Sequence, residues 1–193
     1  MTSNSHTVYY IESYLIYCVR ADIEDHSDEL EDVIIREHNA IRKFHRAHPL
    51  DKITDNEYTR NRCKAKVGHP LSFSPPGADS QYGENVYRMN GKSLDYKKVA
   101  DLVVLAWSKS KKDYKWEQEN PESKHLSFTQ MIWKDTKKIT CAICGQKVNS
   151  KVEATIVCNY LPPGNIKNNY KKNVLESMGR TAYEIEKPWF PNS

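Results

Sequence analysis

The alternation of hydrophobic and polar residues along the chain predicts several helices. Apolar positions recur every three or four residues over 30–44, and Ser27 stands where an N-cap is expected. His48-Pro49 ends this first helix, because proline disfavours helical backbone in the residue before it. A second apolar stripe predicts a helix over about 94–109, with Ser93 as its N-cap.

The next segments give weaker signals. Residues 50–62 are poorly patterned and predict a poorer helix, whereas 123–133 fits a short one. Residues 68–83 are rich in proline, glycine and serine, which predicts a long loop. Residues 84–87 then predict a strand.

Two β-branched runs close the pattern, over 138–144 and 152–160, with a polar segment between them. Such runs predict an antiparallel hairpin. Helices combined with late antiparallel strands predict an α+β layered domain. The longest wholly apolar run covers only 102–107, so we expect no transmembrane helix.

Composition adds limits on function. The 193 residues carry a net charge of +4, and basic residues are mixed with acidic ones along most of the chain, which argues against a nucleic-acid partner. The hydrophobic share is 38%, and it includes 12 tyrosines with a polar tip, so the core is thin. We interpret the two dense lysine patches as solvated faces. These patches are Lys109, Lys111, Lys112 and Lys115, and Lys167, Lys171 and Lys172.

The N-terminal segment bears on cellular location. A short apolar run over 13–19 resembles the end of a secretory signal, but Glu12 interrupts it and no basic residue precedes it. We therefore interpret 1–26 as an N-terminal extension with a poor or truncated signal segment. The domain follows over 27–176, and 177–193 form a C-terminal tail.

The cysteines Cys141 and Cys144 lie in a predicted strand and therefore point to opposite faces. This placement argues against a redox pair or a shared zinc ion. Cys144 can reach Cys158 across the hairpin, and Cys63 is the remaining candidate for Cys141. Buried free thiols are the alternative, but a thin core favours disulfides.

Four segments resemble the CAP superfamily, which joins the cysteine-rich secretory proteins, antigen five and the pathogenesis-related class-one proteins. A first-helix motif, a central GEN motif and two C-terminal signatures match it. They are His38-Asn39-x-x-Arg42, Gly83-Glu84-Asn85-Val86-Tyr87, 127–133 with 138–142, and 156–165. Within the superfamily the chain is most similar to the venom allergen-like group.

The resemblance implies a three-layer α-β-α sandwich and an extracellular protein. It also implies that the cysteines matching Cys63 and Cys141 pair, as do those matching Cys144 and Cys158.

The family cleft holds two histidines and two glutamates, which bind a divalent ion in several members. Glu84 matches one glutamate, and His69 is the candidate for one histidine. Ser110 replaces the second glutamate and Ser127 the second histidine. We expect Glu84 at the floor of a concavity with His69 as its nearest histidine, and His125 pointing elsewhere. Weak divalent-metal binding is then the most that this residual site offers, and we assign no catalytic residue and no cofactor.

The resulting hypothesis is a non-enzymatic secreted CAP-domain protein of the venom allergen-like type. Its partner is expected to be a sterol or fatty acid, or a host or cell-surface protein, and not a nucleic acid. One alternative is a divalent-metal-dependent hydrolase with a residual cleft. Another is an intracellular CAP protein with reduced cysteines that associates with membranes through its basic patches.

Overall fold

Helix α2 (Ser27–Phe44) follows the apolar stripe predicted from the sequence. Leu30 and Ile34 are fully buried on its inner face. Acidic residues occupy the first turn and basic residues the last, which complements the helix dipole. The chain leaves the helix before His48-Pro49, as expected.

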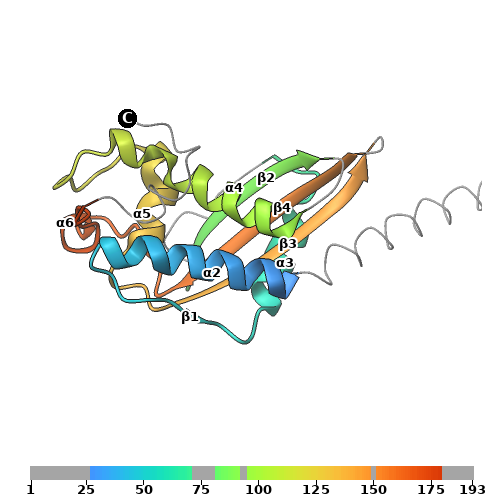
Figure 1. Cartoon of the computed structure of the whole chain (residues 1–193), viewed down its shortest axis with the longest axis horizontal. Helices are drawn as coiled ribbons and strands as arrows, with labels where there is room; N and C mark the ends of the chain where they lie inside the picture. The colour runs from blue at the N-terminus through green and yellow to red at the C-terminus, as the bar shows by residue number, and fades with distance from the viewer. Residues whose placement is uncertain (1–26, 71–80, 92–94, 149–150, 180–193) are drawn as a thin grey trace, which may run out of the picture.

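The computed structural model (Figure 1) contains a four-stranded sheet in the order β1-β3-β4-β2. Its described residues are 27–70, 81–91, 95–148 and 151–179. The strands are β1 (Asp51–Lys52), β2 (Gly83–Gly91), β3 (Lys138–Val148) and β4 (Lys151–Leu161). Strand β1 is parallel to β3, and the other pairings are antiparallel. The predicted hairpin is confirmed, and β2 is longer than expected because it pairs with β4 along its whole length.

Helices cover both faces of this sheet (Figure 1). Helices α2 and α4 (Tyr96–Ser108) pack on one face together with α5 (Leu126–Ile132), over the main hydrophobic core. Helix α3 (Glu57–Lys66) packs on the other face, over a smaller cluster around Cys63 and Cys144. The predicted α+β sandwich with three α-β-α layers is therefore confirmed. No helix among the described residues is long and apolar enough to span a bilayer.

Several predicted boundaries differ from the structure. The segment predicted as a helix over 50–62 first forms β1, and α3 begins only at Glu57. Helix α4 is capped by Asp95, whose carboxylate accepts a hydrogen bond of 3.2 Å from the backbone N of Lys98. Ser93, the predicted cap, lies outside the described residues, as do the N-terminal extension, 71–80 of the predicted loop and 180–193 of the predicted tail. Short helical turns complete the fold: η1 (Lys109–Asp113), η2 (Ser123–His125) and α6 (Tyr170–Asn173).

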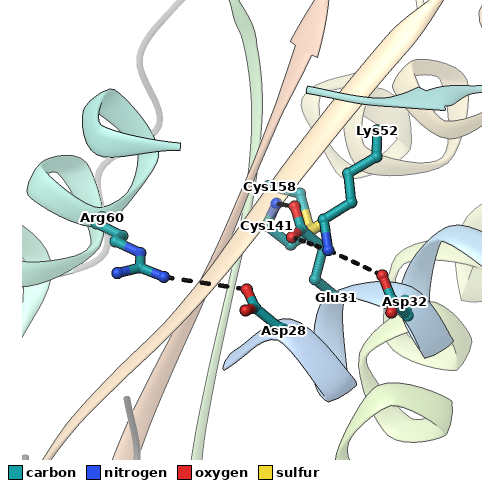
Figure 2. A network of polar contacts seen from close by, with 7 residues as sticks. All are labelled: Asp28, Glu31, Asp32, Lys52, Arg60, Cys141 and Cys158. Atoms are coloured by element: carbon teal, nitrogen blue, oxygen red, sulfur yellow. Dashed lines mark hydrogen bonds and ion pairs between the residues drawn. A yellow bond between two sulfur atoms is a disulfide. The ribbon is translucent and has the colours of Figure 1, made fainter. Parts of the chain in front are cut away.

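The buried carboxylate of Glu31 binds the edge of β3 at a point that the short strand β1 does not reach (Figure 2). Oε1 of Glu31, from α2, accepts a hydrogen bond of 2.7 Å from the backbone N of Cys141. Lys52 of β1 lies 3.0 Å from the other Glu31 oxygen and 2.9 Å from Asp32. Glu31 thus satisfies a backbone donor that a longer β1 would have paired, and Lys52 balances its charge.

The four cysteines predicted to form disulfides do so, but the predicted pairing is wrong. The disulfides join Cys63 to Cys144 and Cys141 to Cys158. Cys141 and Cys144 do point to opposite faces, but the hairpin register places Cys141 directly opposite Cys158 and places Thr155 opposite Cys144. Cys144 therefore faces α3, where Cys63 lies at a Cα–Cα distance of 5.9 Å.

This register predicts the outcome of disulfide mapping. We expect non-reducing proteolysis to release one peptide pair linking Cys63 to Cys144 and another linking Cys141 to Cys158. Cleavage must occur between Cys141 and Cys144, so a low-specificity protease and tandem mass spectrometry are needed. A linked peptide containing Cys63 and Cys141 would contradict the register.

Candidate functional site

Glu84 stands at the start of β2 and faces α3. One oxygen of its carboxylate accepts a hydrogen bond of 3.0 Å from Arg62 Nε, and the other lies 3.1 Å from Arg62 Nη2 and 3.2 Å from Lys66 Nζ. The Glu84 side chain is only 1% exposed and that of Lys66 only 5%. The hydrogen bond to Glu84 also raises the pKa of Arg62. Both carboxylate oxygens are thus engaged by cations.

Arg62 and Lys66 were not singled out from the sequence, although a signal existed. They lie four residues apart on α3, and Cys63 stands beside Arg62. Once α3 is placed with Cys63 toward the sheet, helical spacing brings these two cations to the same side. The weak apolar pattern of α3 hid this, since its sheet-facing residues are largely polar.

Asn85 points to the opposite face of β2 from Glu84, as consecutive strand residues do. Its Nδ2 donates to the backbone O of Ser127 at 3.0 Å and to the hydroxyl of Tyr160 at 3.1 Å. The Tyr160 hydroxyl lies 2.8 Å from Nε2 of His38 on α2. This chain of hydrogen bonds joins α2, the sheet and α5.

The partners of His38 determine its tautomer. Nδ1 lies 2.8 Å from the backbone O of Ile34, which only accepts, so Nδ1 carries the proton. Nε2 then accepts from the Tyr160 hydroxyl. Burial lowers the pKa of His38 to about 4, and the nearby charge of Arg42 acts in the same direction. The imidazole is therefore neutral at physiological pH. Burial likewise raises the pKa of Tyr160.

His125 is 2% exposed and lies between η1 and α5. Its Nδ1 donates to the backbone O of Ser110 at 3.0 Å, and its ring meets the edge of Tyr114 at 5.3 Å. Burial raises the pKa of Tyr114 to about 12. His125 therefore contacts the main chain of Ser110, the position where the resemblance expects a glutamate.

The structure distributes the predicted cleft residues over both faces of the sheet. Ser110 and Ser127 lie on the side of α4 and α5, through their contacts with His125 and Asn85. The Glu84 carboxylate lies on the side of α3. His69 is exposed just beyond the end of α3, and its backbone N donates to the backbone O of Lys66. The role of Glu84 and His69 as residual metal ligands stays a prediction.

This donor set does not fit a divalent metal. Arg62 and Lys66 occupy both oxygens of Glu84, and a metal ion would have to displace them. Serine hydroxyls at 110 and 127 are weak zinc ligands beside the usual imidazole, thiolate and carboxylate. Among the described residues, no group of three or more His, Cys, Asp and Glu side chains could hold a metal ion.

Comparison with models of protein families identifies the family of this chain. Residues 35–160 match the family described as CAP, the cysteine-rich secretory protein family. The chain belongs to the CAP family. The match includes His38, Glu84, Asn85 and Tyr160, so the polar contacts on both faces of β2 lie within the family domain.

Relatives of the chain differ in how much of their length they share with it. A human protein, Golgi-associated plant pathogenesis-related protein 1, is 29% identical over 157 residues, which cover 77% of this chain and 94% of that protein. Venom allergen 5 from Vespula maculifrons is 32% identical over 94 residues, which cover 47% of this chain and 41% of the allergen.

Solved structures of similar fold include the crystal structure of NaASP2 with Zn²⁺. It is 21% identical, covers 78% of this chain and 87% of its own, and aligns with a TM-score of 0.59. Schistosoma mansoni venom allergen-like protein 4 aligns over 78% of this chain with a TM-score of 0.53 and 17% identity. At these identities the likeness concerns the fold.

Because His38 is buried in its neutral form, we expect the free energy of unfolding to depend on pH. The unfolded chain binds a proton at His38 below about pH 6.5, whereas the native protein resists it until about pH 4. The free energy of unfolding therefore falls as pH drops through this window, by about 3 kcal/mol from this group. Urea titrations at pH 7, 5.5 and 4 should show a flatter pH dependence in His38→Gln than in the wild type.

The matched control for this experiment is His48→Gln, because the His48 side chain is exposed. This variant should keep the pH dependence of the wild type. Equal slopes for wild type and His38→Gln would show that His38 is not buried in its neutral form.

Proposed function

We propose that this chain is a non-enzymatic, secreted CAP-domain protein that acts by binding a partner. The observation that carries the proposal is the ion pair of Glu84 with Arg62 and Lys66. A metal-dependent hydrolase needs an ion that polarises the bond to be cleaved and a base that activates water. Here the carboxylate expected to hold the ion instead forms ion pairs with two cations, one of them buried.

The contacts of His38 and His125 in the described part of the chain offer no base for a serine nucleophile, which further supports a binding role. The ring of His125 donates from Nδ1 to a backbone oxygen, and the Ser127 backbone O accepts from Asn85. His38 is bonded at both ring nitrogens within the core. Nucleophilic catalysis needs a hydroxyl or thiol within reach of a base that a third group orients. Neither histidine contacts a serine hydroxyl among the hydrogen bonds of the described residues.

Two disulfides support a location outside the cytosol, where such bonds persist. The names of two relatives, venom allergen 5 and a probable pathogenesis-related protein of Candida albicans, agree with action at an interface between organisms. We infer that the partner is a sterol or fatty acid, or a protein of a host or cell surface. Equilibrium binding of cholesterol and palmitate, compared with binding to intact cells, tests these two classes of partner. Saturable binding of either lipid would favour the lipid, and binding to cells alone would favour the surface protein.

A zinc titration tests the proposed loss of metal chemistry. At neutral pH, calorimetry of the wild type with micromolar zinc should show no saturable binding, because Arg62 and Lys66 hold both oxygens of Glu84. Tight zinc binding that Glu84→Gln abolishes would overturn the proposal and favour the residual hydrolase. The matched control is Glu153→Gln, which removes a carboxylate from β4 outside the cleft.

A second candidate is an intracellular CAP protein associated with membranes. It is favoured by the human relative whose name is Golgi-associated and whose length is matched over 94%. The redox state separates the two candidates. In this candidate the protein purified from cells carries five alkylatable thiols without reduction, since the chain has five cysteines.

For the secreted protein, alkylation without a reductant should leave Cys63, Cys141, Cys144 and Cys158 unmodified. After reduction, the intact mass should show that all four have been alkylated. The measurement uses material from the culture medium and from the cell pellet of one expression. Recovery solely from the pellet with all thiols free would exclude the secreted form.

A further inference from the structure

We propose that the surface around α6 binds a sulfated polysaccharide. This α6 surface consists of five lysines and Asp135, and the carboxylate of Glu119 lies at the start of the helix. The lysines are Lys134, Lys137, Lys167, Lys171 and Lys172. Four of the lysines are exposed and Lys134 is half-buried. The inference rests on the extracellular location in the proposed function, but it does not depend on the metal chemistry of Glu84.

The lysines come from two segments that fixed contacts hold together. The backbone N of Lys134 donates to the backbone O of Asn173 at 3.1 Å, and the backbone N of Asp135 donates to Asn173 Oδ1 at 2.8 Å. Asn173 is 1% exposed. The loop after α5 and helix α6 therefore form one unit, with their lysines on a shared surface.

An aromatic contact fixes α6 to the core. The Tyr170 ring meets the edge of Trp133 at 5.1 Å, and its backbone N donates to Glu119 Oε2 at 3.2 Å. Tyr170 is 5% exposed and Trp133 is 2% exposed. Lysines on either side of a buried tyrosine are presented from a rigid backbone, which lowers the entropy lost on binding.

The charge of this surface is poorly neutralised. Lys172 pairs with Asp135 at 3.2 Å. The pKa of Asp135 lies below its usual value. Burial alone would raise this pKa, but hydrogen bonds from Lys172 and Asn173 and the charge of Lys137 lower it. Within the described residues, none of the other four lysines has a carboxylate within ion-pair distance. Asp135 thus faces an excess of positive charge.

Elsewhere in the described chain, cations are commonly paired with acids. Lys52 contacts Glu31 and Asp32, and Lys98 contacts Asp95. Further pairs are Arg36–Glu37, Arg60–Asp28, Arg62–Glu84, Lys66–Glu84 and Lys124–Glu122. The lysines at α6 differ from these paired cations, and they share this excess of positive charge with the lysine patch at 109–115.

The lysines at α6 and the acidic residues at the start of α2 lie at opposite ends of α2. Helix α2 begins with acidic residues, and α6 lies near its other end (Figure 1). His45 and Arg46, just past the end of α2, donate to backbone oxygens of Leu175 and Glu176, which follow α6. A polyanion would be attracted to the α6 end and repelled from the start of α2, so it would bind in one orientation.

The ligand chemistry follows from these features. Lysine ammonium groups are point charges without the planar fork that favours bidentate recognition, so they suit a repeating series of sulfate groups on a flexible polymer. Such a partner lies outside the cell, where the proposed function places this protein. Binding should release counterions and weaken steeply as salt rises.

Heparin binding of the full chain tests the inference. Affinity is measured by calorimetry with a heparin oligosaccharide at two salt concentrations. We expect Lys167→Gln/Lys171→Gln/Lys172→Gln to weaken binding at least about tenfold at low salt and to reduce the salt dependence. The control Lys97→Gln/Lys98→Gln/Lys151→Gln removes the same charge from exposed lysines elsewhere and should change affinity less than about twofold.

Other outcomes overturn the inference. Equal loss in both triple variants would mean that net charge, and not the α6 surface, attracts heparin. No heparin binding by the wild type at physiological salt would exclude the site. Vesicles of phosphatidylserine and phosphatidylcholine, and a DNA duplex, serve as alternative polyanions. Tighter binding to either one, lost in the α6 variant, would assign the surface to a membrane or to nucleic acid instead.

Discussion

The buried guanidinium of Arg42 holds together the segments on which the rest of the fold depends. Its Nε donates to the backbone O of His48 at 2.8 Å, and Nη1 and Nη2 donate at 2.9 Å to three further backbone oxygens. These belong to Met131, Trp133 and Thr136, at the end of α5 and in the loop that enters β3. The side chain is fully buried.

A buried cation without a carboxylate partner needs compensation from oriented dipoles. The oxygens of Met131 and Trp133 stand at the C-terminal end of α5, where the helix dipole is negative, so they supply it. Burial lowers the pKa of Arg42 to about 10, which leaves it charged at neutral pH. A lysine could not replace it, because an ammonium group has only three N–H donors on one atom, whereas the guanidinium of Arg42 donates to four backbone oxygens. The positions of Ser127 and of the α6 surface both follow from this anchoring of α5 and its loop.

How far the sequence predicted this structure depends on the kind of constraint. Helix α2 and the hairpin followed from periodicity, because burial of one face is a local property of the pattern. The disulfide pairing did not, because it depends on the register of two strands. Strand β3 continues to Val148 and β4 begins at Lys151, which aligns Cys141 with Cys158. A polar segment interpreted as an open loop leaves that alignment undetermined.

In the candidate site, too, the sequence predicted what depends on a local motif and missed what depends on contacts between distant segments. The position of Glu84 was identified by its motif, but its partners were not, since Arg62 and Lys66 come from a helix with little apolar pattern. A carboxylate kept for metal binding and one kept for an internal ion pair are indistinguishable in one sequence. They differ in what removal does: without Glu84, the buried ammonium group of Lys66 would lose the carboxylate that lies 3.2 Å from it, and breaking a buried ion pair is destabilising by about 3–5 kcal/mol. In this chain Glu84 therefore has a structural reason to be a carboxylate that requires no ion.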